Sequence, residues 1–141
     1  MRWTRLAPAL VLLAVLTGCG TRFRIESSGP PGPVYPLFSL AGMRKCLVAH
    51  GVRLGGRPDA VASSATGGAF VAHLDGNEVT VSVGQTIPQG VGLETAYRRF
   101  SQGDLRSSLG TVLRRYDNVV TLWHVAPAEA PLSRLVGCLR A

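Results

Sequence analysis

The dipeptide Asp75-Gly76 constrains the fold more than any other part of this chain, because Asp-Gly between two apolar runs is a strong signal for a two-residue β-hairpin turn. Residues 69–74 and 78–83, on either side of it, have the composition of strands. The hairpin register pairs Phe70 with Val81 and Ala72 with Val79 on one side, and Val71 with Thr80 and His73 with Glu78 on the other. The first side is apolar in both strands, which supports this register.

Three other segments have the apolar periodicity of helices. The first extends from a cap at Ser39 to about His50, where Gly51 can end it. The second covers residues 89–102, and the third has Pro131 in its first turn. Their apolar faces are formed in turn by Leu40, Met43, Leu47 and His50, by Leu93, Ala96, Tyr97 and Phe100, and by Leu132, Leu135, Val136 and Leu139.

The run from residue 104 to residue 116 is ambiguous. Its apolar positions allow a helix, whereas Gly110 and the turn-like residues 117–118 favour a strand at residues 111–115 that pairs with the next strand. We prefer the hairpin. Residues 119–125 are β-branched and aromatic and are apolar on both sides, so we expect this strand at the centre of the sheet.

The order of these elements predicts an α+β fold. We expect a two-layer sandwich, in which a small antiparallel sheet carries helices on one face. Residues 37–141 are enough for one domain with its own core, and 46% of the whole chain is hydrophobic, which excludes wholesale disorder.

The N-terminal segment has the features of an export signal. Arg2 and Arg5 precede an apolar run at residues 6–16, which at eleven residues is shorter than the about 20 that a membrane-spanning helix needs. Leu-Thr-Gly-Cys at residues 16–19 resembles the lipobox of bacterial lipoproteins at all four positions. The resemblance implies that Cys19 receives a diacylglyceryl group and becomes the first residue of the mature chain.

This resemblance divides the chain into three parts: a signal peptide at residues 1–18, a lipidated Cys19 with a tether at residues 19–36, and the domain at residues 37–141. The tether is rich in Pro, Gly and Ser and has no apolar period, so it should be extended and semi-rigid. We therefore expect the domain at the extracytoplasmic face of the cell membrane, held there by its N-terminal lipid.

Cys46 and Cys138 remain when Cys19 is lipidated. Each lies beside the apolar face of a terminal helix, and the compartment outside the cytoplasmic membrane permits disulfides. We predict that they bond and join the first helix to the last. Lys45-Cys46-Leu47, Gly137-Cys138-Leu139 and the stretch from Asn118 to Trp123 resemble small actinobacterial envelope proteins, a group without a known activity to transfer.

Charge suggests a surface for anionic partners. The chain has 15 basic and 8 acidic residues, a formal net charge of +7, and its basic residues are almost all arginine. The doublets Arg98-Arg99 and Arg114-Arg115 are the best candidates for contact with anionic lipid or a wall polymer. Codon bias in a high-GC genome would also explain the arginines. No basic run is interleaved with aromatic residues, so we expect no nucleic-acid partner.

Catalytic motifs are weak. His50, His73 and His124 lack the spacing of a metal site, and we expect no metal and no cofactor. We therefore predict a non-enzymatic binding or assembly module that contacts another, unknown envelope protein or polymer. The alternative is a small envelope enzyme or metal-binding factor that uses His73, Glu78 and His124, which requires these three side chains to lie close together. An exposed cross-strand ion pair would also account for His73 opposite Glu78.

Overall fold

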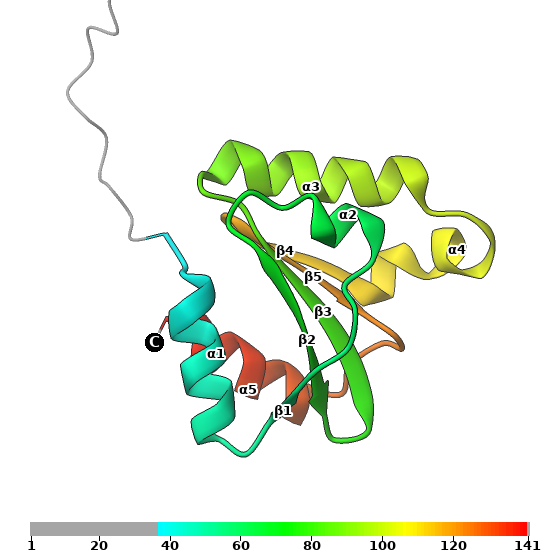
Figure 1. Cartoon of the computed structure of the whole chain (residues 1–141). Helices are drawn as coiled ribbons and strands as arrows, with labels where there is room; N and C mark the ends of the chain where they lie inside the picture. The colour runs from blue at the N-terminus through cyan, green and yellow to red at the C-terminus, as the bar shows by residue number, and fades with distance from the viewer. Residues whose placement is uncertain (1–36, 141) are drawn as a thin grey trace, which may run out of the picture. The chain divides into compact units, whose positions relative to one another are not determined.

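The computed structural model describes residues 37–140, in which five helices and five strands form one sheet-based domain (Figure 1). The helices are α1 (Leu40–Ala49), α2 (Ala60–Ser63), α3 (Ile87–Phe100), α4 (Gly103–Val112) and α5 (Glu129–Leu139). The strands are β1 (Arg53–Leu54), β2 (Ala69–Leu74), β3 (Asn77–Val83), β4 (Leu113–Tyr116) and β5 (Val119–Trp123). The predicted signal peptide, the lipidation site Cys19 and the tether lie outside the described residues.

All strand pairs are antiparallel, and the strand order is β1-β2-β3-β5-β4. The predicted hairpin is confirmed, with Phe70 opposite Val81 and with both turn residues at positive φ, 50° for Asp75 and 82° for Gly76. The prediction that the strand beginning at Val119 is internal is confirmed, because β5 lies between β3 and β4.

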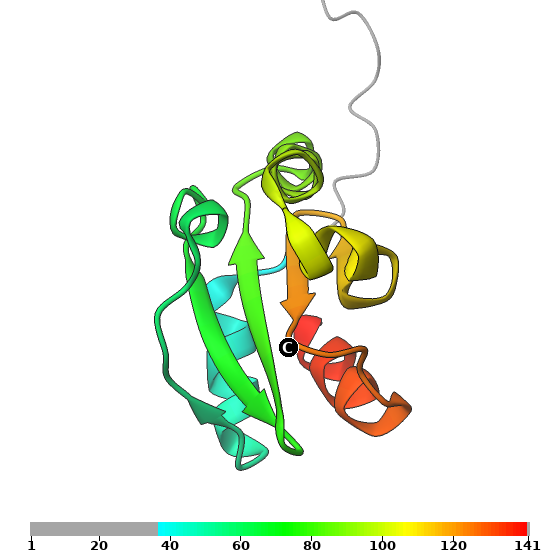
Figure 2. The ribbon, with the colours of Figure 1, turned by 90° about the vertical axis from the view of Figure 1, so that its right-hand side faces the viewer.

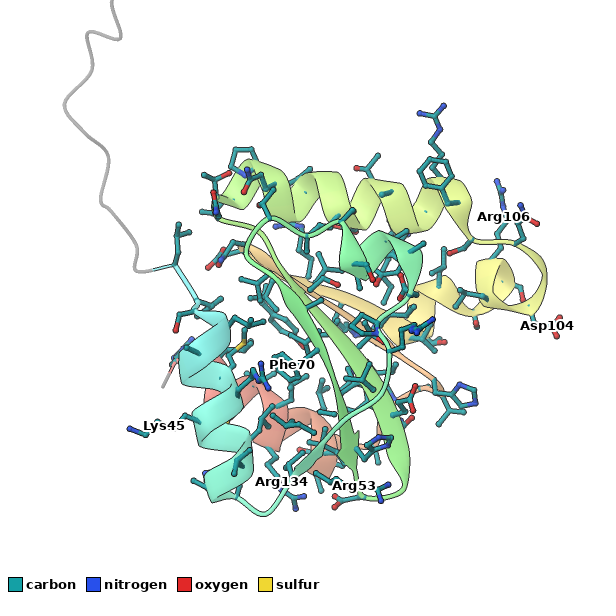
Figure 3. All side chains as sticks on the ribbon, viewed as in Figure 1. Lys45, Arg53, Phe70, Asp104, Arg106 and Arg134 are labelled. Carbon is teal, nitrogen blue, oxygen red and sulfur yellow. A yellow bond between two sulfur atoms is a disulfide. The ribbon has the colours of Figure 1, made fainter. Side chains whose placement is uncertain are left out.

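The α+β class, the antiparallel sheet and the linked terminal helices are as predicted. Helices lie on both faces of the sheet, however, rather than on one (Figures 1 and 2). On one face α1 and α5 pack against alternate residues of β2, β3 and β5, with the side chains drawn in Figure 3. This core includes Met43, Leu47, Phe70, Val81, Trp123 and Leu135. On the other face α2, α3 and α4 cover a smaller core that includes Leu93, Tyr97, Leu109, Leu113 and Val120.

The second layer exists because β5 is apolar on both sides. Val119 and Trp123 face the core of the terminal helices, whereas Val120 faces α3 and α4, and all three are buried. A sheet with water on one face would expose Val120, at a cost of about 1.5–3 kcal/mol for that side chain. None of the five helices in residues 37–140 has both the length and the apolar character that crossing a bilayer requires.

The ambiguous run contains both of the predicted structures. Helix α4 extends to Val112, and β4 begins at the next residue and forms a hairpin with β5. The strand therefore begins two residues later than predicted. The second predicted helix begins at Ile87 rather than at Gln89, because Thr86 caps it: the Thr86 hydroxyl accepts from the Gln89 N–H at 3.3 Å, and the Gln89 side chain accepts from the Thr86 N–H at 3.1 Å.

The predicted disulfide is confirmed. Cys46 on α1 and Cys138 on α5 are bonded, their Cα atoms are 5.5 Å apart, and they close a loop of 92 positions. The bond therefore joins the first helix of the domain to the last, on the face of the sheet that these two helices cover.

The buried side chain of Asn118 joins three distant parts of the chain. It accepts from the N–H of Phe38 at 3.1 Å, donates to the carbonyl of Phe38 at 3.0 Å, and donates to the carbonyl of Gly84 at 2.8 Å. The start of the domain, the end of β3 and the β4–β5 turn are thereby fixed at one point.

Candidate functional site

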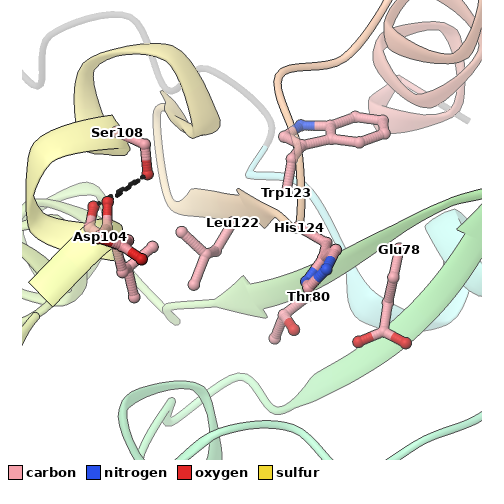
Figure 4. Close-up of a pocket in the computed structure, with 8 residues that line it drawn as sticks. Glu78, Thr80, Asp104, Ser108, Leu122, Trp123 and His124 are labelled. Carbon is pink, nitrogen blue, oxygen red and sulfur yellow. Dashed lines mark hydrogen bonds between the residues drawn. The ribbon is translucent and has the colours of Figure 1, made fainter.

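A cleft between α4 and the sheet brings several polar side chains together. Its volume is about 370 Å³, near the lower limit for small-molecule sites. Figure 4 shows the residues that line it, which are Glu78, Thr80, Asp104, Leu105, Ser108, Leu122, Trp123 and His124. The cleft lies on the sheet face that α2, α3 and α4 cover.

Strand alternation and helix periodicity place these side chains. Glu78 and Thr80 are two apart on β3 and therefore point to the same face. Trp123 contributes its backbone to the cleft, because its indole ring turns to the opposite face and is 1% exposed (Figure 4). Asp104 and Ser108 are four apart on α4 and lie on one side of that helix.

The three residues of the enzyme hypothesis do come together. His73 is opposite Glu78 in the β2–β3 ladder, and their side chains approach to 3.8 Å between Nδ1 and Oε2. His124 follows β5 directly and donates its backbone N–H to the carbonyl of Glu78 at 2.8 Å. Glu78 therefore lies between His73 on β2 and His124 just after β5, and its side chain is half exposed.

The polar groups in and beside the cleft already have partners that limit their chemistry. Nε2 of His73 is 3.0 Å from the Gly55 carbonyl oxygen, which can only accept, so Nε2 carries a hydrogen. The Ser108 hydroxyl donates to the carbonyl of Asp104 at 3.0 Å, within reach also of the Leu105 carbonyl (Figure 4). A hydroxyl whose hydrogen is held by a backbone carbonyl has no base to activate it as a nucleophile. Its oxygen remains available as an acceptor.

What the cleft can do follows from this lining. The carboxylates of Glu78 and Asp104 accept hydrogen bonds and attract positive charge. The half-buried side chains of Leu105 and Leu122 provide an apolar floor. The arrangement fits a small group that donates hydrogen bonds from one side and is apolar on the other.

The sequence did not indicate Asp104, Ser108 or Thr80 as site residues. Asp104 begins the ambiguous run at residues 104–116, for which the sequence favours a hairpin over a helix. The i, i+4 spacing of Asp104 and Ser108 on a helix was the signal that would have identified this side of the cleft.

Two of the four candidate arginines meet at Glu94. Arg98 on α3 and Arg115 on β4 each place a guanidinium nitrogen 2.8 Å from a different oxygen of that carboxylate. The hydrogen bond from Arg98, with a smaller contribution from Arg115, holds the pKa of Glu94 below its usual value against the opposing effect of burial. The two ion pairs join α3 to β4, and the Glu94 carboxylate offsets part of the positive charge of the two arginines.

The other two arginines have different surroundings. Arg114 donates to the carbonyls of Gly110 at 2.9 Å and of Leu113 at 3.1 Å, and so satisfies the end of α4. The guanidinium of Arg99 lies 5.5 Å from the ring centroid of Phe100, which is 63% exposed. One arginine of each doublet therefore pairs with Glu94, Arg114 closes α4, and Arg98 and Arg99 lie exposed on α3.

A hydrogen-bond network between α2 and α3 has a structural role. The Tyr97 hydroxyl donates to Asp59 at 2.8 Å, and the other Asp59 oxygen accepts from the N–H of Ala62 and caps α2. Burial raises the pKa of Tyr97, so its hydroxyl stays protonated and able to donate. The network holds α2 against α3.

One group of three metal-ligating side chains converges within residues 37–140. It consists of Cys46, His50 and Cys138, whose ligand atoms all lie within 4.8 Å of one another. His73 and His124 are not part of it.

No protein-family model matches the chain, and no curated protein or solved structure matches it either. What the protein does therefore has to be inferred from its own residues.

Proposed function

We propose that this chain is a lipid-anchored extracytoplasmic protein that works as a non-enzymatic binding module of the cell envelope. The observation that carries the proposal is the use of its three cysteines. Cys46 and Cys138 bond to each other, which suits an oxidising compartment. The remaining cysteine, Cys19, stands at the end of the lipobox-like sequence, where a thiol is needed for the lipid.

The α4–sheet cleft supports a binding role. Its two carboxylates and its hydroxyl oxygens can accept hydrogen bonds from an ammonium group or from sugar hydroxyls, both of which are common in envelope polymers. Half of the Glu78 side chain faces water, so a ligand can reach its carboxylate from solvent. We propose the cleft as the site where an envelope component binds.

The arginines of the doublets retain a proposed secondary role. Arg98 and Arg99 are exposed on α3 and can approach an anionic lipid or a wall polymer. Arg98 shares Glu94 with Arg115, but its side chain is more exposed, 55% against 33%, so we expect the anionic contact to depend on the α3 pair.

Site-specific photo-crosslinking in intact cells tests the binding role. A photoreactive residue at position 108 reports on the cleft, and one at Val48 is the control, because Val48 is 58% exposed on α1, a helix of the opposite sheet face. We expect one discrete adduct from position 108, none from position 48, and loss of the adduct when Glu78→Gln is added. The same adducts from both positions would contradict the proposal.

The enzyme hypothesis remains the second candidate, because Glu78 and His124 line one cleft and His73 approaches Glu78 from the neighbouring strand. The two hypotheses differ in what Glu78→Gln does. In an acid–base enzyme the variant would hold its ligand and stop turnover, whereas in a binding module it weakens the capture itself.

A further inference from the structure

The disulfide has a histidine beside it. Cys46 lies on α1, and His50, four residues later, is the cap residue at the C-terminal end of that helix. Cys138 comes from α5, and the ligand atoms of all three lie within 4.8 Å of one another. Around a tetrahedral zinc ion, with bonds of about 2.0–2.3 Å, neighbouring ligand atoms are about 3.3–3.8 Å apart. The three side chains therefore need only small rotations to meet one ion.

The helices that carry these residues do not depend on the disulfide alone. Met43 and Leu47 of α1 and Leu135 of α5 are 1%, 0% and 0% exposed, and they share the larger core with Cys138. If the bond is reduced, this packing keeps the two thiols facing each other. His50 is exposed, so an ion can reach the site from solvent.

We propose that Cys46, Cys138 and His50 form a zinc site in the reduced protein, and that the disulfide and the metal are alternative states of one site. A protein dithiol supplies two electrons and two protons to the disulfide and becomes a disulfide itself, which leaves Cys46 and Cys138 as thiols. Zinc then binds both as thiolates, and the two thiol protons are released to solvent. Neutral His50 supplies the third ligand, and a water molecule completes the tetrahedron.

This site differs from the cleft in position and in state. It lies on the face of the sheet that α1 and α5 cover, and it exists only while the cysteines are reduced. Two thiolates and one imidazole favour zinc over the hard cations magnesium and calcium.

The test is a zinc titration of the full chain carrying Cys19→Ser, which removes the one thiol outside the site. A phosphine reductant keeps the pair reduced, and binding is followed by competition with a chromogenic chelator. We expect one zinc ion per reduced chain and none per oxidised chain. His50→Ala should weaken binding by about 10-fold or more, and the control His124→Ala should leave it unchanged.

Two results would overturn the proposal: reduced protein that binds no zinc at one equivalent, or a His50→Ala variant that binds as tightly as its parent. Circular dichroism of the reduced chain without metal covers the case in which reduction loosens the fold. In that case zinc must restore the native spectrum with one equivalent, and failure to do so also refutes the site.

Discussion

Replacement of Asn118 by alanine tests how the structure joins the start of the domain to its sheet. The variant loses three hydrogen bonds, two to the backbone of Phe38 and one to the carbonyl of Gly84. The bond to Gly84 is buried, so its carbonyl is left without a partner at a cost of about 1–3 kcal/mol. The two groups of Phe38 are partly buried, and each lost bond costs about 0.5–1.5 kcal/mol.

We therefore expect Asn118→Ala to lower the free energy of unfolding by about 2–6 kcal/mol. Asn77→Ala is a matched control. The Asn77 side chain also joins distant backbone, because it donates to the carbonyl of Val125 at 2.9 Å and accepts from the Val125 N–H at 3.3 Å, but both bonds are exposed. Water can replace them, so the loss should stay below about 1 kcal/mol.

Urea unfolding at equilibrium, followed by the fluorescence of the buried Trp123, measures both variants. The slope of free energy against urea should not change, and the midpoint should fall much further for Asn118→Ala than for Asn77→Ala. Equal losses in the two variants, or a loss below about 1 kcal/mol for Asn118→Ala, would refute the reasoning that burial decides the cost.

Three further predictions use other features of the domain. Replacing Cys46 and Cys138 by serine together should lower the free energy of unfolding by up to about 4–5 kcal/mol in denaturant titrations, because a closed loop of 92 positions is opened; an unchanged midpoint would contradict this. Gly90→Ala should lower the free energy of unfolding by about 1–3 kcal/mol, because the added Cβ would press on the backbone of the β4–β5 turn. Gly92→Ala is the control, since nothing lies within 4 Å of its added Cβ. The same denaturation assay should show Gly92→Ala as neutral or as stabilising by up to about 1 kcal/mol. Burial raises the pKa of Tyr97 in the folded state. The stability linked to its protonated hydroxyl is therefore complete below the unfolded-state pKa of about 10 and is lost as the pH rises above that value. Thermal unfolding measured against pH should show a smaller alkaline loss of stability in Tyr97→Phe than in the parent chain.

Local chemistry made parts of the fold predictable from the sequence. Asp75-Gly76 determines its own turn, and side-chain alternation then determines the whole β2–β3 register. The Cys46–Cys138 bond followed from two cysteines beside the apolar faces of two helices. In each case a few neighbouring residues carry the whole signal.

The elements that the sequence did not predict are stabilised by tertiary packing rather than by local preference. Helix α4 contains Gly110 and two adjacent serines, which are poor helix formers, and the packing of Leu109 and Val112 in the two cores outweighs that preference. Strand β1 has only two residues and exists through its pairing with β2. The second helical layer did have a signal in the sequence, because a strand that is apolar on both sides needs cover on both faces.

The candidate site also depends on tertiary packing that local sequence patterns do not indicate. His73, Glu78 and His124 were recognised as one group from the hairpin and the strand that follows, but the cleft itself depends on α4 and so could not be derived without it. The arginine doublets looked alike in sequence, whereas Glu94 and the end of α4 engage three of the four arginines.

The intact mass of the protein extracted from membranes, measured before and after reduction and alkylation, tests the central claim most directly. We predict a chain that begins at Cys19 and carries a diacylglyceryl adduct, with two thiols, those of Cys46 and Cys138, that react only after reduction. An unmodified Cys19, or free Cys46 and Cys138 thiols in the native protein, would contradict the account of a lipid-anchored, disulfide-linked envelope protein.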